Sequence, residues 1–157
     1  MSRFVILLGG DLVRTPRVDR DVAGARVIAA DGGMRHAATL GVVPELWTGD
    51  FDSVSDTLAA EWPHVPREVF PTGKDQTDGE LAVVAALARG ATSLLLAGAF
   101  GGPRADHAFL HLVLALRLFE QGVPTALTGG AQEGHPLPLG RKAFDYAPGT
   151  LFSILGF

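Results

Sequence analysis

The 157-residue sequence contains no cysteine. This absence excludes a disulfide framework, a thiolate metal site and a cysteine nucleophile. Positive charge is also scarce, since 13 lysines and arginines stand against 17 aspartates and glutamates, giving a net charge of −4. A general nucleic-acid-binding protein usually presents a basic surface, so we expect no nucleic-acid partner. A chain without cysteine suits a reducing compartment, and we expect a cytoplasmic protein.

Long apolar runs and several familiar catalytic motifs are also missing. The longest apolar stretch, residues 108–119, is interrupted by His111 and Arg117 and is too short to cross a membrane, so we expect no membrane partner. No Gly-x-Ser-x-Gly elbow is present, which leaves serine-based acyl transfer unsupported. Asp75 follows Gly73-Lys74 where a P-loop needs Ser or Thr, so the chain is not a P-loop kinase.

Short apolar runs that alternate with helical patterns predict the fold. Strands are expected at residues 4–8, 26–30, 46–48, 68–70, 93–97 and 124–128. Helices are expected at residues 34–40, from Ser53 or Ser55 to 62, 79–89 and 106–121, and residues 11–21 are expected to form a loop. Repeated strand–helix–strand spacing of this kind predicts an α/β fold with a mostly parallel sheet.

Acidic residues recur just after the carboxyl ends of the expected strands. The members of this set are Asp31, Asp50, Asp52, Asp75, Asp78 and Asp106. Ligands of open α/β sheets bind beyond these strand ends, so the carboxylates would collect at one rim. Asp50 and Asp52, two residues apart on an extended segment, would face one spot, where Mg²⁺ would relieve their repulsion. The alternative is an acidic surface turn, which Gly, Asp and Ser commonly build.

A glycine-rich turn supplies a second feature. Gly98, Gly101 and Gly102 lie between an expected strand and a long expected helix, where backbone N–H groups favour phosphate. Arg104 and Lys74 are candidate cations for phosphate oxygens. His107 and His111 have a spacing used by zinc sites, but no Glu follows His107 and no cysteine exists, which favours a packed or hydrogen-bonded pair.

Four linked motifs resemble the motif series of the thiamine pyrophosphokinases. They are Asp31-Gly32-Gly33, Gly49-Asp50-Phe51-Asp52-Ser53, Lys74-Asp75-Gln76-Thr77-Asp78-x-Glu80 and Gly98-Ala99-Phe100-Gly101-Gly102-x-Arg104-x-Asp106-His107. They occur in the family's order over roughly residues 4–128. Pro103 departs from the pattern, because the family usually has Arg directly after the glycine pair.

This resemblance implies the domain organisation. Residues 1–128 would form a Rossmann-like α/β domain that binds ATP and Mg²⁺, with helices on both faces of the sheet. Residues 129–157 would form a β-rich segment that resembles the start of a β-sandwich domain and is incomplete as a thiamine-binding domain. We expect its strands at residues 143–146 and 150–155. The family works as a homodimer, and we expect residues about 140–157 to contact a second copy.

The resemblance also implies the reaction and its residues. The diphosphoryl group of ATP would move to the hydroxyl of thiamine, giving thiamine diphosphate and AMP. The implied Mg²⁺ ligands are Asp31, Asp50, Asp52 and Asp78. The implied catalytic residues are Asp50, Asp52, Asp78 and Asp106, with Asp78 or Asp106 as the general base. The implied residues for ATP or thiamine are Lys74, Thr77, Gly98, Gly101, Gly102, Arg104 and Ser153.

Other functions stay open at this point. The chain is alternatively a diphosphokinase that acts on a pterin-type alcohol. A weaker variant is a metal-dependent phosphohydrolase with Asp50 as its nucleophile. A non-catalytic nucleotide-binding module is an alternative from a different class. Analysis of the products formed from ATP, Mg²⁺ and thiamine would separate these functions.

Overall fold

The computed structural model describes residues 1–71, 73 and 75–157. Its strands are β1 (Arg3–Leu7), β2 (Arg26–Ala30), β3 (Leu46–Gly49), β4 (Arg67–Val69), β5 (Ser93–Ala97), β6 (Thr125–Thr128) and β7 (Glu133–Gly134). Its helices are α1 (Pro16–Val22), η1 (Asp31–Met34), α2 (Arg35–Leu40), α3 (Asp56–Glu61), α4 (Asp78–Ala88) and α5 (Ala105–Glu120). The sheet order is β4-β3-β2-β1-β5-β6-β7, and every pair is parallel except β6–β7. The predicted α/β fold is confirmed.

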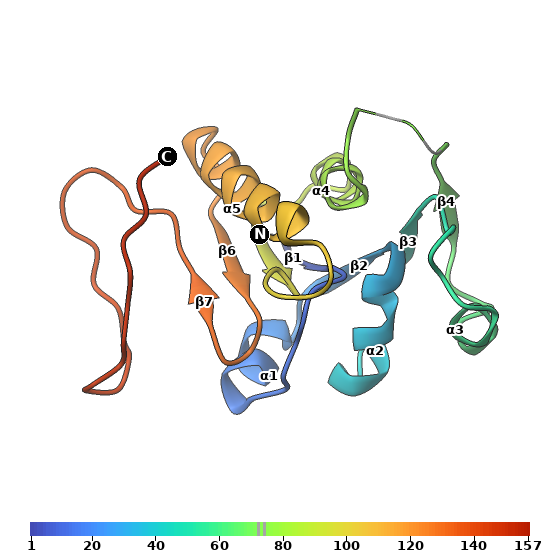
Figure 1. Cartoon of the computed structure of the whole chain (residues 1–157), viewed down its shortest axis with the longest axis horizontal. Helices are drawn as coiled ribbons and strands as arrows, with labels where there is room; N and C mark the ends of the chain where they lie inside the picture. The colour runs from blue at the N-terminus through green and yellow to red at the C-terminus, as the bar shows by residue number, and fades with distance from the viewer. Residues whose placement is uncertain (72, 74) are drawn as a thin grey trace.

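Helices cover both faces of this sheet, as expected. Figure 1 shows α4 and α5 on one face and α1, α2 and α3 on the other. Alternate side chains of β1 lie on opposite faces of the sheet. Phe4 and Ile6 belong to one apolar cluster, and Val5 and Leu7 belong to the other. A strand buried on both faces needs a continuous apolar run, and the run at residues 4–8 therefore indicated β1 correctly.

Helix α1 and the two-residue strand β7 are elements that the sequence did not predict. Residues 11–21 were expected to form a loop, but α1 begins at Pro16 and ends at Val22. The Thr15 hydroxyl accepts a hydrogen bond from the Val18 N–H. Proline is tolerated at the first helical position because a backbone N–H there would have no acceptor within the helix. Only Val18 and Val22 of this helix are buried, so its apolar stripe is too narrow to stand out in a polar segment.

The two strands expected at residues 143–146 and 150–155 are also absent. The structure describes all of residues 135–157 and assigns none of them to a strand. A strand needs a partner edge, and β7, at the edge of the sheet, is only two residues long. Figure 1 shows the segment as a loop and an extended run beyond β7.

This segment contacts the domain through a polar and aromatic cluster, and Phe157 also lies against Phe109 of α5, with ring centroids 5.8 Å apart. Arg17 Nε lies 2.6 Å from Glu133 Oε1, and the Tyr146 hydroxyl donates to the other carboxylate oxygen of Glu133. His135 Nε2 lies 2.8 Å from the Tyr146 hydroxyl oxygen. Burial and the hydrogen bond to Glu133 raise the pKa of Tyr146 to about 12, so its hydroxyl stays a donor at neutral pH.

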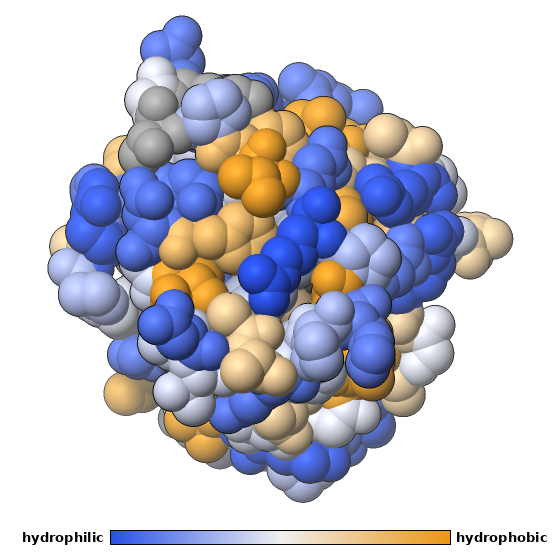
Figure 2. Space-filling model, turned by 90° about the vertical axis from the view of Figure 1, so that its right-hand side faces the viewer, coloured by the Kyte–Doolittle hydropathy of each residue, from blue (hydrophilic) through white to orange (hydrophobic). Residues whose placement is uncertain are grey.

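The molecular surface mixes polar and apolar side chains. Figure 2 shows the face on the side of β4 and α3, where hydrophilic side chains lie between smaller apolar areas. Within the described residues, no helix is both long enough and apolar enough to span a membrane.

Candidate active site

Three carboxylates from three elements meet at the carboxyl rim of the sheet. Asp31 directly follows β2, Asp50 directly follows β3, and Asp78 begins α4. One carboxylate oxygen of each lies within 4.8 Å of the others, and all three side chains are partly buried. The parallel strands produce this meeting, because their carboxyl ends share one edge.

The electrostatics of this group favour a cation. Burial raises the pKa of Asp78 to about 6, and the charges of Asp31 and Asp50 add to the shift. Asp31 Oδ2 accepts a hydrogen bond from the Ser53 hydroxyl, whereas Asp31 Oδ1 is buried and has no hydrogen-bond partner in the described part of the chain. A buried, unpaired carboxylate oxygen is costly unless a positive group faces it. The all-oxygen set therefore fits a hard divalent cation such as Mg²⁺.

Asp52 does not join this group in the structure. β3 ends at Gly49, and Phe51 has a left-handed backbone with φ 63°, so the segment is a turn rather than an extended strand. The expected geometry, with Asp50 and Asp52 facing one spot, is therefore wrong. Asp52 is exposed, and its N–H donates to Asp50 Oδ1 at 3.0 Å. Its role as a Mg²⁺ ligand stays a prediction.

The glycine-rich turn lies beside the turn that follows β1. The Gly10 N–H donates to the Gly98 carbonyl at 2.8 Å, and the Asp11 N–H donates to the Phe100 carbonyl at 2.7 Å. Gly98 has φ 76°, and a Cβ there would lie 2.5 Å from the Leu8 carbonyl oxygen, so only glycine fits. The strand pair β1–β5 thus continues into two linked turns.

An aspartate that the sequence analysis missed sits at this turn. Asp11 Oδ2 accepts a hydrogen bond from the Gly102 N–H at 3.2 Å. The glycine turn therefore does face an anionic oxygen, but one supplied by the chain itself. Asp11 follows the first strand and Gly9-Gly10, so the same strand-end rule that selected Asp31 could have found it.

Arg104 and Asp106 form an exposed ion pair. The guanidinium donates to the two carboxylate oxygens at 2.9 and 2.7 Å. This pairing holds the pKa of Asp106 at about 2, well below its ordinary value. Among the described acidic residues, Asp106 is not part of the group formed by Asp31, Asp50 and Asp78. The two candidate bases therefore differ strongly in proton affinity.

Thr77, predicted to contact phosphate, caps a helix. Its hydroxyl accepts from the Glu80 N–H at 3.2 Å, while the Glu80 carboxylate accepts from the Thr77 N–H at 2.8 Å. This reciprocal capping box fixes the start of α4 and hence the position of Asp78. Lys74 lies outside the described residues. Ser153 is exposed in the C-terminal segment, and its predicted place near thiamine is untested.

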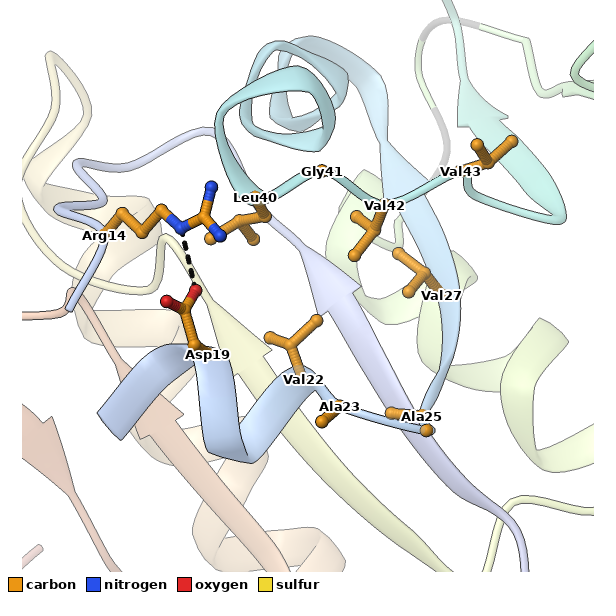
Figure 3. A pocket seen from close by; sticks show the side chains of 11 residues that line it. Arg14, Asp19, Val22, Ala23, Ala25, Val27, Leu40, Gly41, Val42 and Val43 are labelled. Atoms are coloured by element: carbon orange, nitrogen blue, oxygen red, sulfur yellow. Dashed lines mark hydrogen bonds and ion pairs between the residues drawn. The ribbon is translucent and has the colours of Figure 1, made fainter. Parts of the chain in front are cut away.

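A separate pocket lies at the opposite end of the strands. It has a volume of about 450 Å³ and is formed by the segments that precede β2 and β3. Figure 3 shows Val22, Val27 and Leu40 around the hollow, with the Arg14–Asp19 ion pair at one side. None of the three clustered carboxylates lines it, so it is not part of the candidate site.

Comparison with known proteins adds a family and a set of structures. The model for the thiamin pyrophosphokinase catalytic domain matches residues 23–127. The thiamine pyrophosphokinase of Bacillus subtilis is similar in structure, with a TM-score of 0.69 and 25% identity over 81% of this chain and 60% of that chain. The thiamin pyrophosphokinase of Geobacillus thermodenitrificans has a TM-score of 0.64 and 28% identity over 82% of this chain and 59% of its own. No match was found among curated protein sequences. The chain thus spans about 60% of the length of these solved relatives.

Proposed function

Because this chain belongs to the thiamin pyrophosphokinase family, we propose that it transfers the diphosphoryl group of ATP to the hydroxyl of thiamine, releasing AMP. The observation that carries the proposal is the meeting of Asp31, Asp50 and Asp78 at the carboxyl rim of the sheet. All three residues lie within the segment matched by the catalytic-domain model. Diphosphoryl transfer needs charge neutralisation and alignment more than covalent help, and this rim suits both.

Asp31, Asp50 and Asp78 would hold Mg²⁺, and Asp52 is proposed as a further ligand. The bound ion would supply positive charge for the phosphate oxygens at the point where negative charge develops. The unpartnered Asp31 Oδ1 supports this assignment, because it is the atom that most needs a positive partner.

The phosphate chain of ATP is proposed to lie along the two linked turns. Arg104 and the backbone of Gly98, Gly101 and Gly102 would face its oxygens, with Lys74 as a further cation. Both Arg104 and the Gly102 N–H already point at carboxylate oxygens, those of Asp106 and Asp11. Donors that are held against one anion are suitably oriented for another.

The two candidate general bases differ in how readily they would accept a proton. Arg104 holds the pKa of Asp106 at about 2, so Asp106 would accept a proton poorly while this ion pair is intact. Without a cation, burial raises the pKa of Asp78 to about 6, but a bound Mg²⁺ would lower this pKa again. Both carboxylates are therefore kept as candidates to take the proton of the thiamine hydroxyl.

The remaining assignments concern thiamine and assembly. Residues 1–128 are proposed as the ATP- and Mg²⁺-binding domain, and residues 129–157 as a segment that contributes to thiamine binding through Ser153. We place the protein in the cytoplasm as a homodimer. These assignments rest on the family to which the chain belongs. The chain spans about 60% of the length of its solved relatives.

Product analysis tests the proposed reaction. The protein is incubated with ATP, Mg²⁺ and thiamine, and we expect AMP and thiamine diphosphate in equal amounts. Asp50→Asn should lower the rate by roughly a hundredfold, because it removes a ligand while keeping the oxygen that accepts from Asp52. AMP formed with a different acceptor, no AMP at all, or a near-normal rate for Asp50→Asn would each contradict the proposal.

A further inference from the structure

Two buried histidines lie against the linked turns at the carboxyl rim, one from each face of the sheet. His36 belongs to α2 and is 6% exposed, whereas His111 belongs to α5 and is 8% exposed. Figure 1 shows these two helices on opposite sides of the sheet. The chemistry proposed for the three carboxylates gives neither histidine a task.

His36 holds the turn that follows β1. Its Nε2 lies 2.8 Å from the Gly10 carbonyl oxygen, which can only accept, so Nε2 carries the proton. A Cβ on Gly98 would lie 3.2 Å from the same nitrogen, so the ring also sits against the turn that follows β5. Burial lowers the pKa of His36, and the charge of Arg35 lowers it further, although Gly10 and Asp11 act in the opposite direction. The ring is therefore neutral at physiological pH.

His111 holds the turn that follows β5 from the other side. Its Nδ1 lies 2.9 Å from the Ala99 carbonyl oxygen, so here Nδ1 carries the proton. A Cβ on Gly79 would lie 3.7 Å from its Nε2, which places the ring against the first turn of α4 beside Asp78. Burial lowers the pKa of His111, and the charge of His107 adds to this.

The two histidines thus use opposite ring nitrogens on two turns that are bonded to each other. The Gly10 N–H donates to the Gly98 carbonyl, and the Asp11 N–H donates to the Phe100 carbonyl. We propose that His36 and His111 are positioning residues that clamp residues 9–11 and 98–102 through an Nε2–H and an Nδ1–H donor, and so set the phosphate side of the site. The effect on ATP rests on the proposed function, whereas the effect on the turns rests on these hydrogen bonds alone.

Amide side chains can test the clamp because they copy one ring nitrogen each. The Gln amide nitrogen reaches the place of the His Nε2, and the Asn amide nitrogen reaches the place of the His Nδ1. His36→Gln and His111→Asn should therefore preserve the turns. His36→Asn and His111→Gln are the matched controls. They also carry an amide, but its nitrogen does not reach the position of the ring nitrogen that donates in the unsubstituted protein.

The first measurement is hydrogen–deuterium exchange of peptides that contain residues 9–11 and 98–102, together with steady-state kinetics. In the two controls we expect exchange of these peptides to be about tenfold faster and the KM for ATP about tenfold higher, with kcat changed less, because one hydrogen bond to a buried carbonyl is lost. In His36→Gln and His111→Asn both quantities should stay within about threefold of the unsubstituted protein. Equal behaviour of both amides at either position overturns the proposal.

The second measurement is the nitrogen NMR spectrum of the imidazole rings in the unsubstituted protein. We expect the Nε2–H tautomer for His36 and the Nδ1–H tautomer for His111, and the reverse assignment at either residue overturns the clamp. Neither this spectrum nor hydrogen exchange needs a substrate. If the unsubstituted protein forms no AMP, the proposed function fails while these two measurements still decide the clamp.

Discussion

At the scale of single residues, the candidate site concentrates negative charge that the protein chain itself leaves uncompensated. Asp31 Oδ1 is buried without a hydrogen-bond partner in the described part of the chain, and Asp50 and Asp78 lie beside it. Such an arrangement lowers the stability of the folded state, as is common where a site is built for a charged ligand. The charge cost should therefore be measurable in the protein without metal.

We predict that Asp78→Asn stabilises the metal-free protein at pH 7. The pKa of Asp78 in the folded state, about 6, exceeds the ordinary value of 3.8, so the folded state binds this proton more tightly than the unfolded chain does. The free energy of unfolding therefore falls as pH rises from about 4 to about 6, and stays low above that range. After a discount for the partial exposure of the side chain, the gain is about 1 kcal/mol, or about 2–4 °C in Tm.

Thermal melts in a chelating buffer at pH 4 and pH 7 measure this effect. The gain should be present at pH 7 and much smaller at pH 4, where Asp78 is protonated in the folded state and about half protonated in the unfolded chain. Glu61→Gln is the matched control and should change Tm little at either pH, because Glu61 is exposed and outside the carboxylate group. Mg²⁺ should raise the Tm of the unsubstituted protein more than that of Asp78→Asn. A lower Tm for Asp78→Asn at pH 7 would refute the charge argument.

Most acidic residues of the candidate site could be predicted from the sequence. Residues that directly follow parallel strands lie together at the carboxyl rim of the sheet. Asp31 and Asp50 follow apolar runs directly, so the strand-end rule placed them together. The same rule failed for Asp52, because the left-handed backbone of Phe51 turns the chain before it. The Arg104–Asp106 pair was also beyond prediction, since two neighbouring opposite charges can pair or point apart.

At the scale of elements, the start of α4 matters most for the site. The capping box of Thr77 and Glu80 fixes the first turn, and Asp78 is the first residue of that helix. His111 packs against the same turn near Gly79. A change in this cap should therefore affect both the stability of the helix and the placement of one carboxylate.

We predict that Thr77→Ala costs about 1 kcal/mol, seen as a fall of about 2–4 °C in Tm, because the Glu80 N–H loses its acceptor. Thr77→Ser keeps the hydroxyl and is the control, with a Tm close to that of the unsubstituted protein. AMP formation should fall in the alanine variant and persist in the serine variant. An alanine variant with unchanged Tm but lost activity would show that Thr77 acts on the substrate and not as a cap.

Elements differed in how well the sequence revealed them. The central strands stood out because burial on both faces requires unbroken apolar runs such as that of residues 4–8, whereas the two-residue strand β7 was not predicted. Helix α1 was missed although Thr15 and Pro16 form a known start signal, since a polar segment with two buried valines shows little periodicity. In this segment the local start signal of Thr15 and Pro16 indicates the helix, and the apolar pattern does not.

At the scale of the whole molecule, the C-terminal segment, residues 135–157, differs from the sheet because it forms no strands. Its apolar residues resemble strand patterns, but strand formation depends on a partner edge that local sequence does not specify. The position of this segment against the α/β domain instead depends on contacts between residues distant in sequence, such as that between Arg17 and Glu133. Several of its apolar side chains stay exposed, among them Leu151 at 95%, Phe152 at 84% and Ile154 at 72%. A monomer rarely exposes so many large apolar side chains in one stretch.

We predict that two copies of the chain pair through this segment, with a double substitution, Leu151→Glu with Phe152→Glu, producing a monomer. Both side chains are exposed in the single chain, so its Tm at low protein concentration should change little, within about 0.5 kcal/mol of unfolding free energy. Light scattering should give twice the chain mass for the unsubstituted protein and one chain mass for the double variant. Val43→Glu is the matched control, because Val43 is 74% exposed but lies at the separate pocket, and it should stay dimeric. A monomeric unsubstituted protein, or a double variant that stays dimeric, would show that residues 140–157 do not join the subunits.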